Sequence, residues 1–287
     1  MSREINDKKQ YYMQFLKDEF EVTVRFKEVF KEFKNDLNCG CLRVAEKKND
    51  EWVVNTWIKE FILKGFKYGV HKEFFIEGQG IYYDKDTLGT RNITFEDNIR
   101  SVANNVSIRD GAYLAPGVIC MPPSFVNIGA YVGEDTLIDS NALVGSCAQI
   151  GKQVHISAGT QIGGVLEPVR TLPVIVEDDV FIGGNCGIYD GVIIKNRCTI
   201  GAGTILTGSV SIYDIPNKRI ISEKNGKPLV IEEGAVVVPG ARTIACDAFD
   251  SVKIVLQTPV IIKYLKKDDR RIALEDLLRY SEDKFIF

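Results

Sequence analysis

Apolar residues in the middle of the chain repeat with a period of six. From Ile108 onward every sixth residue is apolar, and the residue two positions before it is small or β-branched. The apolar series consists of Ile108, Leu114, Cys120, Val126, Val132, Ile138, Val144, Ile150, Ile156 and Ile162, and then of Val176, Ile182, Ile188, Ile194, Ile200, Leu206 and Ile212. Each such hexapeptide is a short strand with a corner, and three hexapeptides form one triangular coil with both series inside. The period predicts parallel β-helix coils over residues 106–213 and a mainly β fold.

The repeat is interrupted once within this stretch. Its register breaks at Gly163 and returns fourteen residues after Ile162. Residues 164–173 are therefore expected to leave the coil as an excursion loop. A further turn at Ala235–Gly240 is expected to extend the stack.

The flanking sequences have other periods. Apolar residues recur at helical spacing between residues 12 and 33, and again over Glu51–Phe66, where Asp50 is expected to cap the helix. After the coils, Lys253–Tyr264 has the pattern of a strand, and Ile272–Tyr280 has the pattern of a short helix.

These patterns divide the chain into three expected parts. A small, mostly helical N-terminal domain covers residues 1–100, although its last part, residues 74–100, has a mixed pattern that predicts no particular element. The β-helix domain covers residues 101–245, and a short C-terminal α/β tail covers residues 246–287.

Composition excludes several classes of partner. The 287 residues are 45% hydrophobic and 26% charged, with a formal net charge of −3, which is typical of a globular protein and indicates neither a nucleic-acid nor a membrane partner. No stretch approaches the ~18 apolar residues of a membrane span. The polar N-terminus, MSREINDKKQ, lacks the apolar core of a signal peptide. We therefore expect a cytoplasmic protein.

The seven cysteines are irregularly spaced, and we expect unpaired thiols and no metal site. Cys39 and Cys41 are the only close pair, and the two histidines, His71 and His155, lie far from them in sequence, whereas zinc wants about four ligands. Three other cysteines occupy inward positions of the repeat: Cys120, Cys186 and Cys198.

Four segments resemble one family of hexapeptide-repeat acyltransferases, the tetrahydrodipicolinate N-succinyltransferases. They are LRVAEKKNDEW (Leu42–Trp52), FVNIGAYVGEDTLID (Phe125–Asp139), VGSCAQIGKQVHISAGTQIGGVLEP (Val144–Pro168) and the C-terminal ALEDLLRY. The resemblance implies a left-handed coil, a homotrimer with active sites between neighbouring β-helices, and transfer of a succinyl group. The donor would be succinyl-CoA as co-substrate, with no tightly bound cofactor. The acceptor would be the amine of ring-opened tetrahydrodipicolinate, L-2-amino-6-oxopimelate, in the diaminopimelate and lysine pathway.

The same resemblance assigns Asp139 a catalytic and substrate-binding role and Arg100 a substrate-binding role. An alkylammonium with a pKa near ~10.4 is almost fully protonated at neutral pH, so a carboxylate must orient it or accept its proton. Asp139 follows the inward Ile138 and should project outward at a corner. An arginine grips a carboxylate of the acceptor with two parallel hydrogen bonds. Arg109 is the rival for that role.

Other residues near the break in the repeat are candidates for cofactor binding and catalysis. Gly163 and Gly164 would let the pantetheine arm of the cofactor approach the backbone, or they would merely turn the chain, and the loop that follows could cover the cofactor. His155 is a rival base, which lies between two inward residues and should point outward. The chain departs from the family pattern at Ser140-Asn141, where a Thr-Trp is usual, and at Gly187, where some members carry glutamate.

Three alternative functions are weighed against this one. A hexapeptide acyltransferase with acetyl-CoA or another amine acceptor stays open, because the sequence does not show the acyl pocket. A metal-dependent enzyme of the carbonic-anhydrase kind needs about three histidines, and the chain has two. A purely structural solenoid would bind no CoA.

Overall fold

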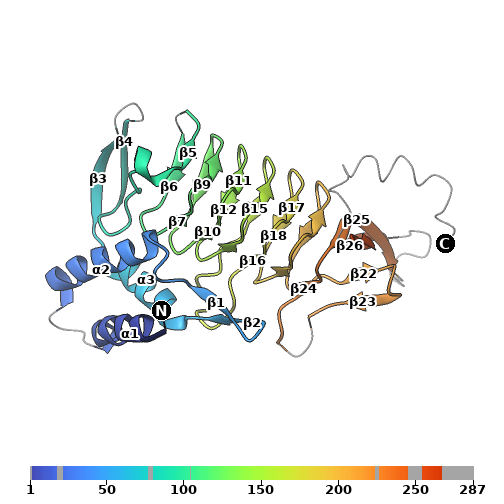
Figure 1. Cartoon of the computed structure of the whole chain (residues 1–287), viewed down its shortest axis with the longest axis horizontal. Coiled ribbons are helices and arrows are strands. Elements are labelled where there is room, and N and C mark those ends of the chain that lie inside the picture. The colour runs from blue at the N-terminus through green and yellow to red at the C-terminus, as the bar shows by residue number, and fades with distance from the viewer. Residues whose placement is uncertain are drawn as a thin grey trace.

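The protein is a stack of triangular coils with helices at its N-terminal end, as Figure 1 shows. The structure is a computed structural model and describes residues 2–17, 22–76, 80–103, 105–223, 226–244 and 254–266. Among these residues, no helix is long and apolar enough to cross a membrane.

Three parallel ladders form the walls of the stack. Sheet I consists of β7 (Tyr113–Leu114), β10 (Tyr131–Val132), β13 (Gln149–Ile150), β16 (Ile175–Val176), β19 (Ile193–Ile194) and β24 (Val230–Ile231). Sheet II begins with β5 (Arg100–Ser101), β8 (Ile119–Cys120), β11 (Leu137–Ile138), β14 (His155–Ile156), β17 (Phe181–Ile182), β20 (Thr199–Ile200) and β25 (Ala235–Ile244). Sheet III consists of β6 (Val106–Ile108), β9 (Ser124–Val126), β12 (Leu143–Val144), β15 (Gln161–Ile162), β18 (Gly187–Ile188) and β21 (Ile205–Leu206).

The register of these ladders confirms the predicted period. Val132 pairs with Ile150 in sheet I, and the same inward residues stack coil after coil. Val144, Ile150 and Ile156 each have no exposed side-chain surface and belong to one core cluster that runs through the stack. Because each coil buries its apolar residues only against its neighbours, this core exists only in the stacked form.

The predicted repeat is wrong at its last step. Ile212 was expected to follow Ile194 in sheet I, but the strand that pairs with β19 is β24, with Ile194 opposite Ile231. Ile212 is buried in the same core but lies in β22 (Ile212–Asp214), which forms a hairpin with β23 (Arg219–Ile221). Both interruptions therefore leave the stack after a strand of sheet III and return in sheet I.

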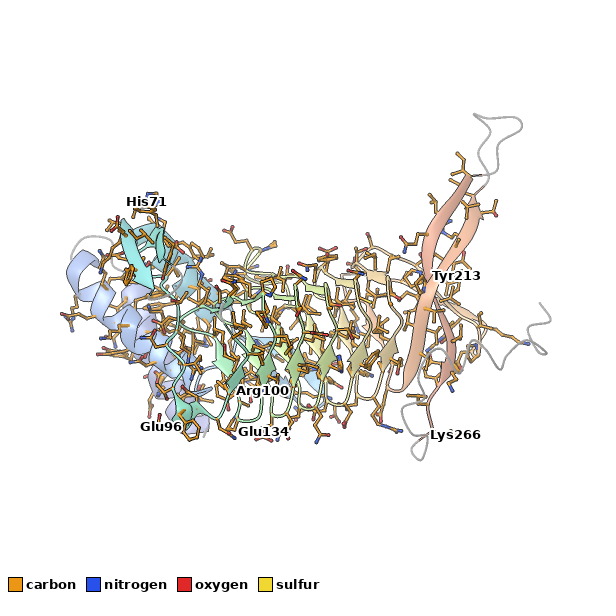
Figure 2. The ribbon with its side chains drawn as sticks, turned by 90° about the horizontal axis from the view of Figure 1, so that it is seen from above. His71, Glu96, Arg100, Glu134, Tyr213 and Lys266 are labelled. Carbon is orange, nitrogen blue, oxygen red and sulfur yellow. A yellow bond between two sulfur atoms is a disulfide. The ribbon has the colours of Figure 1, made fainter. Side chains whose placement is uncertain are left out.

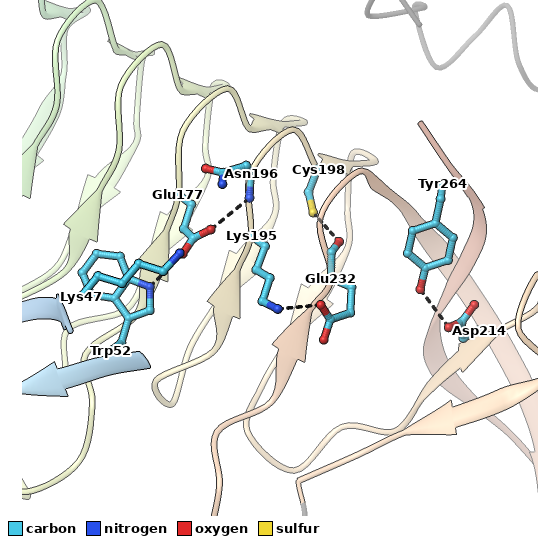
Figure 3. Close-up of polar contacts among 9 residues, drawn as sticks. All are labelled: Lys47, Trp52, Glu177, Lys195, Asn196, Cys198, Asp214, Glu232 and Tyr264. Atoms are coloured by element: carbon cyan, nitrogen blue, oxygen red, sulfur yellow. Dashed lines mark hydrogen bonds and ion pairs between the residues drawn. The ribbon is translucent and has the colours of Figure 1, made fainter. Parts of the chain in front are cut away.

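The stack ends in a long antiparallel hairpin of β25 and β26 (Ile254–Tyr264), which projects from the coils in Figure 2. The beginning of β25 completes the expected last turn, since Val237 pairs with Ile200 of β20. β26 confirms the strand predicted for this region, whereas the predicted helix over residues 272–280 lies outside the described residues. The Tyr264 hydroxyl donates to the buried Asp214 carboxylate and so ties the end hairpins together (Figure 3).

The N-terminal region contains α1 (Ser2–Lys17), α2 (Val22–Asn38) and α3 (Thr56–Tyr68), which pack around an aromatic cluster. The apolar stretch over residues 12–33 thus belongs to two helices. The second predicted helix was placed too early, because Glu51–Val54 forms β2 and pairs with β1 (Ala45–Lys48). Asp50 lies in the turn of this hairpin with φ +64° and caps nothing.

Residues 74–100, which predicted no particular element, contribute to a second hairpin. β3 (His71–Ile76) pairs with β4 (Gly80–Lys85), and a 3-10 turn at Phe95–Asp97 (η1) leads into β5. The first hairpin is fixed to the coils by Glu177, whose carboxylate accepts hydrogen bonds from Lys47 Nζ and Trp52 Nε1 (Figure 3).

The prediction that all the cysteines are unpaired is wrong for one pair. Cys39 and Cys41 form a disulfide in the turn after α2, where their Cα atoms are 5.4 Å apart. Such a separation suits a disulfide, and the turn provides it although only one residue lies between them. Cys120, Cys186 and Cys198 are free and buried at the inward positions that the repeat predicted.

Candidate functional site

Arg100 lies at the start of sheet II with an exposed side chain, in the N-terminal part of the stack (Figure 2). Its backbone is fixed, because its N–H donates to the carbonyl of Val118 at 2.9 Å. Its guanidinium group forms no hydrogen bond or ion pair with any residue that the structure describes. The side chain is therefore available to a carboxylate ligand.

Arg109, the rival, is already engaged. Its Nη1 atom forms an ion pair with the Asp84 carboxylate and also donates to the carbonyl of Leu88. The side chain is mostly buried beside the β3–β4 hairpin. Binding a substrate carboxylate through Arg109 would require breaking this ion pair, so the geometry favours Arg100.

Asp139 occupies the corner after β11, where its backbone N–H donates to the carbonyl of Ile156 at 2.9 Å. Its Oδ1 atom accepts a hydrogen bond from the N–H of Ser140 at 2.7 Å, which orients the carboxylate. No described residue pairs with Oδ2. The half-buried carboxylate thus keeps one oxygen for an ammonium ligand.

Arg100 and Asp139 belong to the same sheet but are not in contact. Arg100 pairs with Ile119 of β8, and β8 pairs with β11, which ends just before Asp139. Their strands are two strand spacings apart, or roughly 10 Å, and Asp139 lies two residues beyond Leu137, the residue in register with Arg100. A molecule that carries a carboxylate several atoms from its amine could reach both side chains.

The backbone conformation explains part of the departure at Ser140-Asn141 from the pattern that the resemblance implies. Asn141 lies at a coil corner with φ +60°, a left-handed conformation that asparagine adopts more readily than a bulky residue. The second departure, Gly187, has a steric explanation, because a Cβ there would lie 2.5 Å from Cε2 of Tyr189. Glutamate at position 187 would require the Tyr189 ring to move.

His155 lies on β14, in register with Leu137 of β11. Its neighbours Val154 and Ile156 are buried in the core, so His155 is on the outer face as predicted. The imidazole packs on the Phe181 ring, with centroids 5.0 Å apart. This contact gives the histidine a packing role on the outer surface of sheet II.

Gly163 and Gly164 lie at a corner where neighbouring coils approach closely. A Cβ on Gly145 would lie 2.2 Å from the backbone nitrogen of Gly164, and a Cβ on Gly163 would lie 2.7 Å from Cδ1 of Tyr189. Stacking alone therefore accounts for small residues here. The geometry also leaves Gly164 exposed beside the excursion loop.

The excursion loop packs against the N-terminal region. The Nζ atom of the fully buried Lys59 donates to the carbonyl of Thr171 at 2.7 Å. Val165 is buried, and Leu166 packs on the aromatic cluster of the helices. The loop is thus anchored at both ends to the part of the chain that precedes the coils.

The coils and the N-terminal region both match known families. Residues 173–208 match a model of the hexapeptide repeat of succinyl-transferases. Residues 12–67 match a model of the tetrahydrodipicolinate N-succinyltransferase N-terminal region. The chain is a hexapeptide-repeat acyltransferase, a class that takes its acyl group from a CoA thioester.

Relatives identify the family within this class. The 2,3,4,5-tetrahydropyridine-2,6-dicarboxylate N-succinyltransferase of Polynucleobacter asymbioticus is 38% identical over 85% of this chain and 86% of its own length. The enzyme of that name from Acinetobacter baylyi is 39% identical over 88% and 89%. The chain belongs to the tetrahydrodipicolinate N-succinyltransferase family. A solved hexapeptide-repeat-containing acetyltransferase from Vibrio cholerae is similar only weakly, with 23% identity, a TM-score of 0.30, and coverage of 42% of this chain and 65% of its own.

One residue that bears on the choice between Arg100 and Arg109 was missed by sequence reasoning. Asp84 engages Arg109 in an ion pair, yet it lies in the stretch where no element was predicted. The alternation of Tyr82 and Asp84 on one face of β4 is visible in the sequence. That alternation could have placed Asp84 on a strand, but not opposite Arg109, because the pairing of β3 with β4 sets its position.

Proposed function

We propose that this chain transfers a succinyl group from succinyl-CoA to the amine of ring-opened tetrahydrodipicolinate, L-2-amino-6-oxopimelate, in the diaminopimelate pathway to lysine. The observation that carries the proposal is the similarity to N-succinyltransferases over most of both chains. The exposed, unpaired Arg100 on the sheet that also carries Asp139 fits an acceptor that has both a carboxylate and an amine.

In the proposed reaction, the amine nitrogen attacks the thioester carbonyl. A C–N bond forms, the C–S bond breaks, and the CoA thiolate leaves and takes up a proton, while the amine loses one. Asp139 orients the amine through its free Oδ2 and accepts this proton, and Arg100 holds a carboxylate of the acceptor. Gly164 offers exposed backbone to the pantetheine arm, next to the half-buried Gly163.

The proposal extends to assembly and location. We propose a homotrimer, because flat β-helix sides pack by threefold symmetry and the outward side chains of Leu137, His155 and Phe181 in sheet II are only partly buried. CoA enters as a co-substrate and no cofactor is tightly bound. We also propose that the enzyme acts in the cytoplasm.

A donor and acceptor assay tests the reaction. The purified protein is incubated with L-2-aminopimelate and either succinyl-CoA or acetyl-CoA, and CoA release is measured. Succinyl-CoA should give the higher kcat/KM. A clear preference for acetyl-CoA would favour the alternative, a related acyltransferase with another donor, and activity only with another amine would change the acceptor.

Asp139→Asn tests the role of the carboxylate. Asparagine is nearly isosteric and Asp139 contributes nothing to the coil core, so folding should be retained. Because asparagine cannot accept a proton, we expect kcat to fall on the order of 10²–10⁴-fold, or about 3–5 kcal/mol of barrier.

His155→Asn is the matched control on the neighbouring strand and should lose little activity. Steady-state rates and thermal melts of both variants decide the assignment. If Asp139→Asn stays within about threefold of the wild type while folded His155→Asn is inactive, His155 is the base instead.

A further inference from the structure

Two adjoining cavities lie between the β1–β2 hairpin, the turn after α2 and the outer face of sheet I. Their volumes are about 560 and 280 Å³. They share four lining side chains: Arg43, Lys47, Trp52 and Tyr131. The larger one is within the size range of pockets that hold small organic ligands.

Arg43 is held rigidly between these cavities. Its guanidinium carbon lies 3.8 Å from the centroid of the Tyr131 ring and 5.4 Å from that of Trp52. Its Nε donates to Oε1 of Gln149 at 2.8 Å. Gln149 is fully buried and its Nε2 faces three backbone carbonyls, which turns Oε1 toward Arg43. The two terminal nitrogens of the planar guanidinium group, called the fork below, are therefore held in place before any ligand binds.

No ion pair neutralises the charge of Arg43, although the carboxylates of Glu46 and Asp178 also line the cavities. The three lysines that line the cavities each form an ion pair: Lys8 with Asp36, Lys47 with Glu177, and Lys152 with Glu134. No carboxylate of the described residues lies within ion-pair distance of Arg43, and no described residue accepts from its terminal nitrogens. Burial lowers the pKa of Arg43, but a guanidinium group is so strongly basic that it stays charged at neutral pH.

An unpaired, partly desolvated guanidinium in a cavity is costly unless a counter-charge joins it. Two terminal nitrogens in a fixed plane match the two oxygens of a carboxylate or a phosphate. The ring of Trp52 and the side chain of Ile5 offer an apolar surface to the rest of such a molecule. We propose that this cavity binds a small organic oxyanion, a carboxylate or a phosphate ester, through Arg43.

This site is separate from the one proposed for acyl transfer. Arg43 packs on β10 and β13 of sheet I, whereas Arg100 and Asp139 belong to sheet II. Four of the residues that line the larger cavity come from the segment LRVAEKKNDEW: Arg43, Glu46, Lys47 and Trp52. The reaction proposed above gives none of these side chains a role.

Isothermal titration of the intact protein with benzoate, phenyl phosphate and neutral benzamide tests the proposal. Benzoate or phenyl phosphate should bind and benzamide should not, and the tighter of the two anions identifies a carboxylate or a phosphate-ester site. Arg43→Lys keeps the charge but loses the fork, so affinity should fall at least tenfold. Lys152→Met is the matched control, because it removes a neighbouring cation without touching the fork, and it should bind like the wild type.

Three results would overturn the proposal: no binding of either anion, equal binding of benzamide, or equal loss of affinity in Arg43→Lys and Lys152→Met. The last would mean that net charge rather than the fork attracts the ligand. If Arg43→Lys fails to fold, a wild-type crystal soaked in benzoate decides the question. The carboxylate should lie against the guanidinium of Arg43, and its absence there would refute the site.

Discussion

The coil stack and the N-terminal helices bury different kinds of apolar side chain. The buried residues of the coil core are aliphatic or small, with no aromatic ring among those described. The core of the helices is built on six large rings: Tyr12, Phe26, Phe30, Phe33, Trp57 and Phe61. The rings of Phe33 and Phe61, for example, have centroids 4.7 Å apart.

Geometry explains the contrast. Each coil has the same triangular cross-section, and each inward side chain contacts its equivalents one coil above and below. A ring at one position would force the neighbouring coils apart, since close-packed interiors tolerate extra volume poorly. Three packed helices have no fixed cross-section and can adjust to rings of any orientation. Periodic structure thus restricts side-chain size, and irregular packing releases that restriction.

The largest effect should come from a charge inside the coil. Ile156→Asp buries an uncompensated carboxylate at a fully buried position in the middle of the stack. We expect a loss of more than about 4 kcal/mol in the free energy of unfolding, enough to abolish folding. Ser157→Asp, at the adjacent corner, is the control. Soluble Ile156→Asp protein with an unchanged melting temperature would disprove the inward assignment.

The loss of a ring from the helical core should destabilise the N-terminal helices without destabilising the coil stack. Phe61→Ala removes a ring from the centre of the aromatic cluster and should cost about 3–5 kcal/mol locally. Because the coil core and this cluster have no buried residue in common, near-ultraviolet circular dichroism should report earlier unfolding in urea than the far-ultraviolet signal. Tyr83→Ala, at a 73% exposed ring, is the control. Coincident transitions would show that the two regions unfold as one unit.

Lys59 joins the two regions and should make their junction sensitive to pH. Burial lowers the pKa of its ammonium group, so between that lowered value and the ordinary value of about 10.4 the unfolded chain binds more protons than the folded chain. Stability from this group therefore rises with pH across that window. The neighbouring Cys147 thiol, whose pKa burial raises to about 12, stays neutral there.

The comparison variant is Lys59→Met, which has no ionisable group. The free energy of unfolding of the wild type, relative to Lys59→Met, should increase between pH 8 and pH 10. Urea titrations of both proteins at several pH values measure it. Parallel profiles would mean that the Lys59 pKa is the same in the folded and unfolded chains.

The smallest effect should come from an ion pair on the coil surface. Lys195 pairs with Glu232 at 2.7 Å across neighbouring coils, with both side chains well exposed (Figure 3). Exposed pairs contribute little, so Lys195→Ala should change the free energy of unfolding by about 0.5 kcal/mol or less. A loss of several kcal/mol in a urea titration would show that such pairs hold the coils together.

The same contrast explains what could be predicted from sequence. The coils were predictable residue by residue. Equivalent positions in successive coils share one environment, so the same type of residue recurs every six positions in the sequence. The prediction failed at Ile212, where a buried apolar residue fits the period although the chain has left the ladder. The start of α3 was also misplaced, since Trp52 and Val54 belong to a hairpin whose apolar residues continue the helical spacing.

The candidate site was only partly predictable. The position of Asp139 at a corner follows from the inward Ile138 before it, and the structure agrees. The choice between Arg100 and Arg109 did not follow, because it depends on Asp84, which a hairpin brings to Arg109 from 25 residues away. The disulfide between Cys39 and Cys41 was missed for a similar reason, since the turn that joins them has no period.

Both interruptions of the repeat leave from the same edge of the prism, after β15 and after β21, and re-enter at sheet I. The hydrogen bonds of the ladders run between coils, so added residues at this edge break none of them. Twelve residues separate β15 from β16, and a whole hairpin separates β21 from β24. Foreign sequence can therefore be inserted at this edge without interrupting the ladders. An epitope or a fluorescent tag spliced into the turn at Asn217-Lys218 should be displayed on a rigid rod without disturbing its stacking.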